Sequence, residues 1–216
     1  KKAKAAPKAV PKAKETVESL FERFCSAQDD SSAAGVEGRT RIGPEGIEAW
    51  TGALGVEPSD RRVLLFCWHA RAAQMGYFTK EEWSRGFAAC HAKTMAGLKR
   101  GLKTLDRTVE DPDDFEEFFE YAFDYCLTEP GQKILDKDTA AAMLQVVMPA
   151  DEPHLAPFVE FLAEQREYKV VNRDMWAGFL RFCQEMDVEC EEYDETSCWP
   201  SILDSFVEWK QEKSKQ

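Results

Sequence analysis

Apolar residues recur at helical spacing along most of the chain, and this pattern predicts a protein built of helices. In a predicted helix over 15–27, Val17, Leu20 and Phe24 fall on one face. A short helix is predicted over 44–54, with proline in its first turn. The run VLLFCW at 63–68 is apolar nearly all round, so its helix is predicted to be central, capped by Ser59 and ending near Met75.

The second half of the chain continues the helical pattern. Thr79 and Glu82 form a predicted capping box for a helix over 80–91, and a longer helix is predicted over 95–108. Asp111 opens an aromatic-rich helix, and further helices are predicted over 137–148 and 152–164. Val170 and Val171 form the only strong β-branched doublet outside a predicted helix, so no sheet is expected.

These elements predict an all-α fold of about ten helices in two packed halves that meet near residue 110. The first half contains two helix-loop-helix units that look like degenerate EF-hands. Residues 1–14 form a Lys/Ala/Pro tail with no face to bury, predicted to be disordered, and residues 15–212 form the predicted folded domain.

The most distinctive stretch runs from 173 to 209 near the C-terminus. Between Glu185 and Glu208 it holds nine Asp or Glu residues and no Lys, Arg or His. A short acidic linker between two apolar helices must fold back if both helices bury their aromatic faces together. That folding would bring Asp174 near Cys198 and Asp204 and form a negatively charged docking notch. No His, Ser or Thr is placed to make this notch catalytic.

Composition and charge narrow the classes of partner. Hydrophobic residues make up 44% of the 216 residues, including six Trp and fourteen Phe, which excludes disorder for most of the chain. The net charge is −12, and because six lysines and one glutamate lie in 1–15, the remainder carries −17. Such a body repels nucleic acid and anionic lipid and attracts a basic protein.

Seven cysteines occur without a CxxC pair, and they are predicted to be buried free thiols, all small core residues, in a reducing compartment. No apolar run approaches the roughly 20 residues that span a bilayer, and no signal peptide is recognisable. We therefore predict localisation in the cytoplasm and nucleus.

Metal and cofactor chemistry is not expected. The loop AQMGYFTKEEW has no early Asp to bind Ca²⁺, and the loop after Asp29 and Asp30 places Ala and Gly at ligand positions. The three histidines lie far apart, and Cys183, Cys190 and Cys198 lack zinc-ligand spacing. We expect no cofactor, no metal site and no catalytic residue.

Five segments together resemble the potentiating-neddylation domain of the Defective in Cullin Neddylation family, over about residues 16–209. They read RIGPEGIEAW, VLLFCWHARAAQMGYFTKEEWSRGF, DFEEFFEYAFDYCLTEPGQKILD, DMWAGFLRFCQ and YDETSCWPSILDSFVEW. The resemblance implies a scaffold-type co-ligase without covalent chemistry of its own. It would bind a cullin C-terminal winged-helix domain and the charged neddylation conjugating enzyme together, within a cullin-RING assembly.

The resemblance also implies two binding sites. The family's cullin-binding patch falls on Asp174, Cys198 and Asp204, with Cys198 in place of the usual Ala. The family's pocket for the N-acetylated methionine of the conjugating enzyme falls on a set of apolar positions. They are Ile47, Val63, Phe66, Cys67, Ala70, Phe78, Tyr125, Met143 and Val146.

Two other functions stay open at the level of sequence: a degenerate EF-hand calcium sensor, and a helical adaptor that uses its acidic patch for another basic protein. The chain is expected to be a monomer. The preferred cullin, the role of the basic tail, the size of any rate enhancement and the loss of an upstream ubiquitin-binding domain are not determined by these patterns.

Overall fold

Helices dominate the part of the chain that the structure describes. The structure is a computed structural model that describes residues 15–25, 41–194 and 196–215. Within these ranges it contains ten α-helices, one 3-10 helix and two pairs of short strands. The predicted mostly helical class is confirmed, whereas the predicted tail 1–14 lies outside the described residues.

The first seven elements, in chain order, are α1 (Val17–Cys25), β1 (Arg41–Ile42), α2 (Pro44–Leu54), α3 (Arg61–Ala70), β2 (Phe78–Thr79), α4 (Lys80–Ala89) and α5 (Met95–Gly101). The 3-10 helix η2 (Leu102–Val109) follows. The remaining elements are α6 (Pro112–Tyr125), β3 (Ile134–Asp136), α7 (Lys137–Val147), α8 (Leu155–Glu164), β4 (Val170–Asn172), α9 (Arg173–Glu185) and α10 (Ser201–Lys213).

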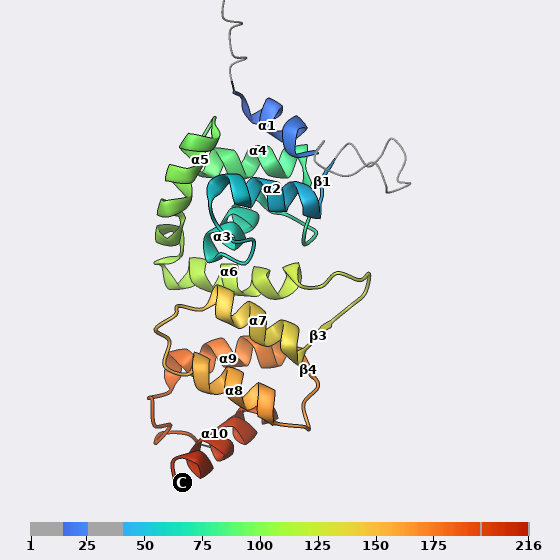
Figure 1. The fold of residues 1–216 in the computed structure, drawn as a ribbon. Helices are drawn as coiled ribbons and strands as arrows, with labels where there is room; N and C mark the ends of the chain where they lie inside the picture. Colours follow the sequence, from blue (N-terminus) through green and yellow to red (C-terminus); the bar gives the residue numbers. More distant parts are fainter. Residues whose placement is uncertain (1–14, 26–40, 195, 216) are drawn as a thin grey trace, which may run out of the picture.

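Helix α6 lies across the middle of the molecule and separates its two halves (Figure 1). Helices α1–α5 lie on one side of it and α7–α10 on the other. The contacts of α6 are with α3 and η2 in the first half and with α7 and α9 in the second. The predicted boundary near residue 110 therefore falls just before the helix that both halves share.

Several helix ends follow the signals read from sequence. Helix α2 starts with Pro44 and ends before Gly55, whose φ of 73° is left-handed and favours glycine. Helix α4 has the predicted capping box: the Thr79 side chain accepts a hydrogen bond from Glu82 N, and the Glu82 carboxylate accepts one from Thr79 N. Asp111 caps α6 by accepting from Asp113 N.

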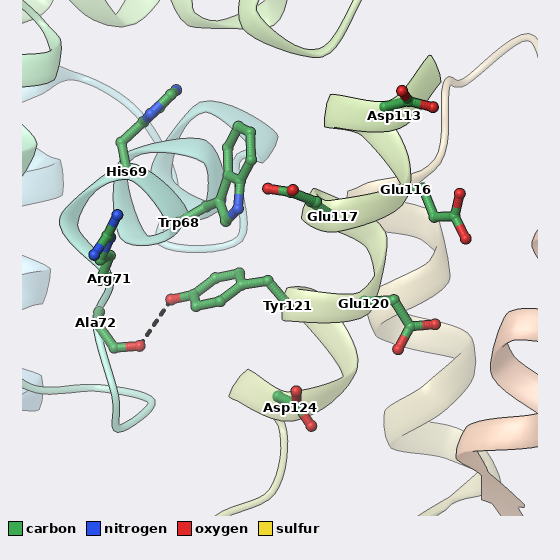
Figure 2. A pocket seen from close by; sticks show the side chains of 10 residues that line it. All are labelled: Trp68, His69, Arg71, Ala72, Asp113, Glu116, Glu117, Glu120, Tyr121 and Asp124. Atoms are coloured by element: carbon green, nitrogen blue, oxygen red, sulfur yellow. Dashed lines mark hydrogen bonds between the residues drawn. The ribbon is translucent and has the colours of Figure 1, made fainter. Parts of the chain in front are cut away.

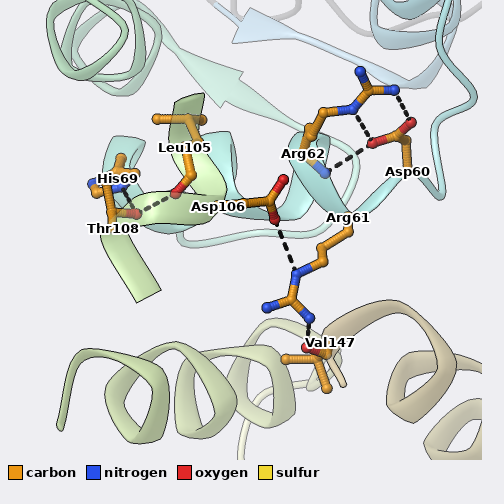
Figure 3. A network of polar contacts seen from close by, with 8 residues as sticks. All are labelled: Asp60, Arg61, Arg62, His69, Leu105, Asp106, Thr108 and Val147. Atoms are coloured by element: carbon orange, nitrogen blue, oxygen red, sulfur yellow. Dashed lines mark hydrogen bonds and ion pairs between the residues drawn. The ribbon is translucent and has the colours of Figure 1, made fainter. Parts of the chain in front are cut away.

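The boundaries of α3 differ from those predicted. Its cap is Asp60 rather than Ser59, and the Asp60 carboxylate accepts hydrogen bonds from the backbone N–H and the side chain of Arg62 (Figure 3). The Arg62 hydrogen bond lowers the pKa of Asp60. The helix ends at Ala70 rather than near Met75, because Arg71 is left-handed with φ of 53°.

The predicted helix over 95–108 is two elements, because the α-helical turns of α5 give way to the 3-10 helix η2. Leu102 and Leu105 of η2 are both buried, and residues three apart lie in line on a 3-10 helix. A spacing of three therefore buries both leucines there.

Two strand pairs correct the expectation that no sheet forms. Strand β1 pairs antiparallel with β2, with Ile42 opposite Phe78, so the loops of the first two helix-loop-helix units meet. Strand β3 pairs antiparallel with β4, with Leu135 opposite Val171. Strands of two or three residues are too short to produce an alternating pattern in the sequence. The resemblance to EF-hands stays a prediction, since residues 26–40 of the first loop lie outside the described residues.

An aromatic cluster forms the core of the first half. Trp50, Phe66, Phe78 and Trp83 are fully buried, and their rings meet at tilted or edge-to-face angles. The Trp50 and Phe66 ring centroids are 4.9 Å apart. Gly86 of α4 lies directly against this cluster, because a Cβ at that position would be 2.3 Å from Phe66 Cζ.

Two glycine substitutions within helices test this packing. We expect Gly86→Ala to lower the free energy of unfolding by about 1–3 kcal/mol, because the added methyl forces the Phe66 ring out of place. The control is Gly52→Ala in α2, where a Cβ meets nothing within 4 Å; it should raise the free energy by roughly 0.4–1 kcal/mol. Urea unfolding curves measure both. A Gly86→Ala protein as stable as the parent would contradict the packing described.

Candidate functional site

Three residues predicted to form a binding patch lie on α9, on the loop after it and on α10. We call Asp174, Cys198 and Asp204 the α9–α10 patch. Asp174 is exposed in the first turn of α9, Asp204 is half-buried in the first turn of α10, and Cys198 is exposed between them in sequence. Negative charge is favoured in the first turn of a helix, because the unpaired backbone N–H groups point there.

Gly178 allows the loop before α10 to lie directly on α9. A Cβ at Gly178 would come within 2.7 Å of Pro200 Cγ, so a larger residue would push the loop away. Asp174 lies four residues before Gly178 and hence on the same side of α9. The side of α9 that carries Asp174 is therefore the side that meets the loop. Among the described residues, no hydrogen bond or ion pair joins Asp174 to Cys198 or Asp204.

A chain of aromatic and polar contacts runs from α9 across the loop to Asp204. The Arg181 guanidinium carbon lies 4.1 Å from the centroid of the Trp199 ring, and the Tyr193 ring is stacked near Trp199 with centroids 6.0 Å apart. The Tyr193 hydroxyl donates a hydrogen bond of 2.5 Å to Asp204 Oδ1. The same guanidinium group donates a hydrogen bond from Nε to Glu185 Oε1 at 2.8 Å, and this hydrogen bond raises the pKa of Arg181.

The first turn of α9 is fixed to α6 by one arginine. Arg173 forms ion pairs with Glu120 and Asp124, and its guanidinium carbon lies 5.1 Å from the centroid of the Phe123 ring. Three residues further on, Trp176 Nε1 donates to Phe119 O at 2.9 Å. Asp174 thus sits between two anchored residues. The sequence did not single out Arg173, Arg181 or Tyr193. Most of their partners are distant in the chain and leave no local spacing, although Glu185 lies only four residues after Arg181.

His154 fixes the other end of α9. Its side chain is fully buried, its Nε2 lies 3.2 Å from Met186 O, and its ring meets Phe182 edge-on with centroids 5.0 Å apart. Nδ1 has no hydrogen-bond partner. Burial lowers the pKa of His154. The neutral ring, with its proton on Nε2, is the form that fits the carbonyl of Met186.

The residues predicted to form the pocket for an acetylated methionine differ widely in exposure. Phe66, Ala70 and Phe78 have no exposed surface, and Val63, Cys67 and Tyr125 are also buried. Ile47, Met143 and Val146 are half-buried. The buried members belong to the core in this conformation, so a ligand reaches them only if neighbouring side chains move. The assignment of the pocket stays a prediction.

Cys67 is shielded from chemistry by its surroundings. The Tyr125 hydroxyl donates a hydrogen bond of 3.5 Å to Cys67 Sγ, and burial raises the pKa of the Cys67 thiol to about 12. A thiol with so high a pKa is protonated at neutral pH and is a poor nucleophile.

The prediction that all seven cysteines are core residues is wrong for one of them. All seven are free thiols and five are buried, whereas Cys183 is half-buried and Cys198 is exposed. Cys198 lies in the loop, where no helical face draws it inward.

An acidic cleft of about 990 Å³ lies between the end of α3 and α6 (Figure 2). The α3 side is formed by Trp68, His69, Arg71 and Ala72. The α6 side carries Asp113, Glu116, Glu117, Glu120 and Asp124. Tyr121 reaches across from α6, and its hydroxyl donates to Ala72 O at 3.0 Å. The carboxylates give this face a negative potential that attracts cationic groups.

Arg61 connects three elements beside a smaller cleft of about 380 Å³ (Figure 3). Its side chain donates to Val147 O at the end of α7 and to Asp106 of η2, with Nε to Oδ1 at 3.3 Å. Val146, one of the predicted pocket residues, also lines this cleft. Burial lowers the pKa of Arg61, while the nearby Asp106 carboxylate opposes that shift.

Glu82 in the first turn of α4 directs its carboxylate at the backbone of the loop between α3 and α4. Glu82 Oε1 accepts from Ala73 N at 2.9 Å and Oε2 from Thr79 N at 2.7 Å.

Across the residues with described positions, no three His, Cys, Asp or Glu side chains gather closely enough to hold a metal ion. No helix in the described ranges combines the length and the apolar character needed to cross a membrane.

Comparison with known proteins identifies the family. A sequence model of the family described as "Cullin binding" matches residues 97–209, which include the whole α9–α10 patch. The human DCN1-like protein 4 is 37% identical over 172 residues, which are 80% of this chain and 58% of the human protein. The human DCN1-like protein 5 is 36% identical over 169 residues, 78% of this chain and 70% of that protein. The chain belongs to the cullin-binding family of DCN1-like proteins.

A relative from another organism matches as well. The DCN1-like protein 2 of Dictyostelium discoideum is 34% identical over 175 residues, 81% of this chain and 65% of that protein. The chain spans about three fifths of the DCN1-like protein 4 relatives, 58% of the human one and 61% of the one from Danio rerio.

The buried His154 predicts a specific dependence of stability on pH. The folded pKa is lowered, so below the unfolded value of about 6.5 the unfolded chain binds a proton that the folded chain does not. The free energy of unfolding should therefore fall as pH decreases from 7.5 to 5.5, by up to about 1.4 kcal/mol per pH unit from this group. His69, whose pKa burial also lowers, acts in the same direction.

The variant His154→Gln should lose stability at pH 7.5 but show a smaller further loss at pH 5.5 than the parent. His91→Asn, at an exposed left-handed position that Asn tolerates, is the control for removing an imidazole. Chemical unfolding at the two pH values measures the difference. An equal loss in parent and His154→Gln would show that His154 does not carry the effect.

Proposed function

We propose that the chain is a non-covalent co-ligase for cullin neddylation. In this proposal the α9–α10 patch binds the C-terminal winged-helix domain of a cullin. A second, apolar site binds the N-terminus of the neddylation conjugating enzyme. The observation that carries the proposal is the match of the cullin-binding family over 97–209, a span that contains Asp174, Cys198 and Asp204.

The geometry of the patch supports the cullin part of the proposal. Asp174 and Asp204 each lie in the first turn of a helix, and Gly178 brings the loop between those helices onto α9. A basic partner surface would meet two carboxylates beside the small Cys198 side chain. The acidic cleft along α6 adds to the negative field that steers such a partner.

The proposed action is one of proximity. A protein that holds the cullin and the charged conjugating enzyme together converts a bimolecular encounter into an effectively intramolecular transfer. The increase in transfer rate depends on both sites being occupied at once, because the two partners have no raised effective concentration relative to each other when either is free. No covalent intermediate on this chain is required, so none of its thiols takes part.

The proposed site for the conjugating enzyme is the apolar set on α2, α3, β2, α6 and α7. Met143 and Val146 on α7 are three residues apart, lie on one side of the helix and are half-buried. The proposed lining carries no Asp or Glu to pair with an ammonium group. An acetylated methionine, which has no terminal charge, is therefore the form of N-terminus that such a lining accepts.

Charge reversal tests the cullin part. We expect Asp174→Lys and Asp204→Lys each to remove most binding of the cullin domain, since an interface charge pair with one partner removed costs about 2–5 kcal/mol. Asp174 is exposed, so its reversal should cost the fold under about 1 kcal/mol. Calorimetry measures binding, and a reconstituted cullin neddylation assay should lose the stimulation by the chain.

The matched control is Asp151→Lys, an equal change of charge at an exposed residue between α7 and α8. It should bind cullin as the parent does. Parent-like binding by the Asp174 and Asp204 variants would mean that the patch is misassigned. Loss of binding by all three variants would point to a general effect of net charge.

Peptide binding tests the second site. We expect the N-terminal peptide of the conjugating enzyme to bind at least tenfold more tightly when its methionine is acetylated, a difference of about 1.4 kcal/mol. A free α-amino group has a pKa near 8, so most of it is charged at pH 7 and must remain in water or lose its proton. The acetylated methionine contributes roughly 1.5–3 kcal/mol when buried. Fluorescence polarisation with the two peptides measures the ratio.

Variants on α7 locate this site. Val146→Arg and Met143→Arg place a charge at half-buried positions and should abolish the preference for the acetylated peptide. Ala142→Arg, at an exposed position of the same helix, should keep it. Equal affinities of the parent for the two peptides would overturn the second site and leave the cullin patch untouched.

A further inference from the structure

The side chain of Asp204 is held by a single tyrosine. Tyr193 donates its hydroxyl hydrogen to Asp204 Oδ1 at 2.5 Å, across the loop that joins α9 and α10. Asp204 is half-buried, and among the residues that the structure describes no hydrogen bond to its other oxygen, Oδ2, is found. The tyrosine therefore occupies one oxygen and leaves the other for a ligand.

The Tyr193 ring is itself held on more than one side. It stacks near Trp199 with an interplanar angle of 23°, and it meets the buried Phe182 at a centroid distance of 6.0 Å. Trp199 in turn packs against Phe182 and under the guanidinium of Arg181. The position of the hydroxyl is thus fixed by packing that reaches into α9.

A second tyrosine bonds to α10 at the neighbouring residue. The Tyr168 hydroxyl lies 3.2 Å from Ser205 Oγ, and Tyr168 is half-buried like Tyr193. Its partner is a neutral hydroxyl outside the α9–α10 patch. The chain therefore holds two similar tyrosine contacts to α10, of which only one involves a carboxylate of the patch.

We infer that Tyr193 is a positioning residue for the α9–α10 patch, which orients the Asp204 carboxylate toward a cationic group of the cullin before binding. This inference rests on the proposed function. A carboxylate that is already oriented loses less conformational freedom when its partner arrives, so the complex is tighter without any additional contact. Tyr193 itself carries no charge, so its effect differs from that of the carboxylates in a measurable way.

Loss of the Tyr193 hydroxyl and loss of a patch carboxylate should affect the association and dissociation rates differently. Long-range steering depends on charge and sets the association rate, whereas short-range contacts set the dissociation rate. Tyr193→Phe removes only the hydroxyl and keeps the ring stacked on Trp199. The association rate and its salt dependence should stay as in the parent, while dissociation becomes faster. A Kd about 3- to 10-fold weaker is expected, in line with the conformational freedom that one unrestrained side chain loses on binding.

The experiment measures binding of the cullin C-terminal domain to the parent, Tyr193→Phe and Tyr168→Phe by surface plasmon resonance at two salt concentrations. Unfolding curves of the three proteins are recorded alongside. We expect a faster dissociation rate for Tyr193→Phe only. Tyr168→Phe removes a hydroxyl bound to the adjacent residue of α10 and should bind as the parent does.

Two results would overturn the inference: a Tyr193→Phe dissociation rate equal to that of the parent, or an equal increase in Tyr168→Phe, which would indicate general loosening of α10. These results are distinguishable from failure of the proposed function. If the parent does not bind cullin, or if Asp204→Lys binds as tightly as the parent, the proposed function fails. If Asp204→Lys loses binding and Tyr193→Phe does not, only the role of Tyr193 fails.

Discussion

The two halves of the molecule depend on aromatic packing on two sides of α6. Toward α3, Phe118 meets Trp68 with ring centroids 5.6 Å apart. Toward α9, Phe119 is stacked on Trp176 at 4.7 Å, and the Trp176 N–H also donates to the backbone oxygen of Phe119. Buried aromatic side chains each remove roughly 150–250 Å² from contact with water and dominate the energetics of a core. This helix of fourteen residues therefore joins the two halves, together with the direct packing of α3 against α7.

The exposed residues of the α9–α10 patch contribute little to the stability of the fold, whereas the residues that hold α9 and the loop in place contribute more. Asp174 and Cys198 are exposed, and changing them removes little packing. Arg173 and His154 fix the two ends of α9, and Gly178 fixes the approach of the loop. The positions of the patch residues are thus set by residues outside the patch, of which His154 is fully buried. Substitution of His154 or Gly178 would weaken binding at the proposed patch by moving its residues.

Sequence patterns were sufficient for the elements with local signals and insufficient for contacts between distant segments. The start of α2 was predicted because Pro44 marks it, and the capping box of α4 because Thr79 and Glu82 lie three apart. The end of α3 was not predicted, since Arg71 adopts a left-handed conformation that its residue type does not announce. The patch residues were named first from the expected fold-back of two apolar helices around an acidic linker, and again through the family resemblance. Most contacts of Arg173, Arg181 and Tyr193 join residues 11 to 53 positions apart, and periodicity carries no information about such pairs. The Arg181–Glu185 pair, four residues apart, does have a local spacing.

The two tyrosine contacts on α10 have a further consequence for the helix as a rigid body. Tyr168 bonds to Ser205 and Tyr193 to Asp204, so the two hydroxyls engage consecutive residues. Consecutive side chains on an α-helix point about 100° apart around its axis. Two contacts in different directions restrict rotation of α10 about its axis more than one would, in addition to its buried residues Ile202, Leu203, Phe206 and Val207. The two contacts therefore help to fix the rotation of α10 about its axis. A shift of register by one residue would rotate Asp204 by about 100° and move it by about 1.5 Å along the axis.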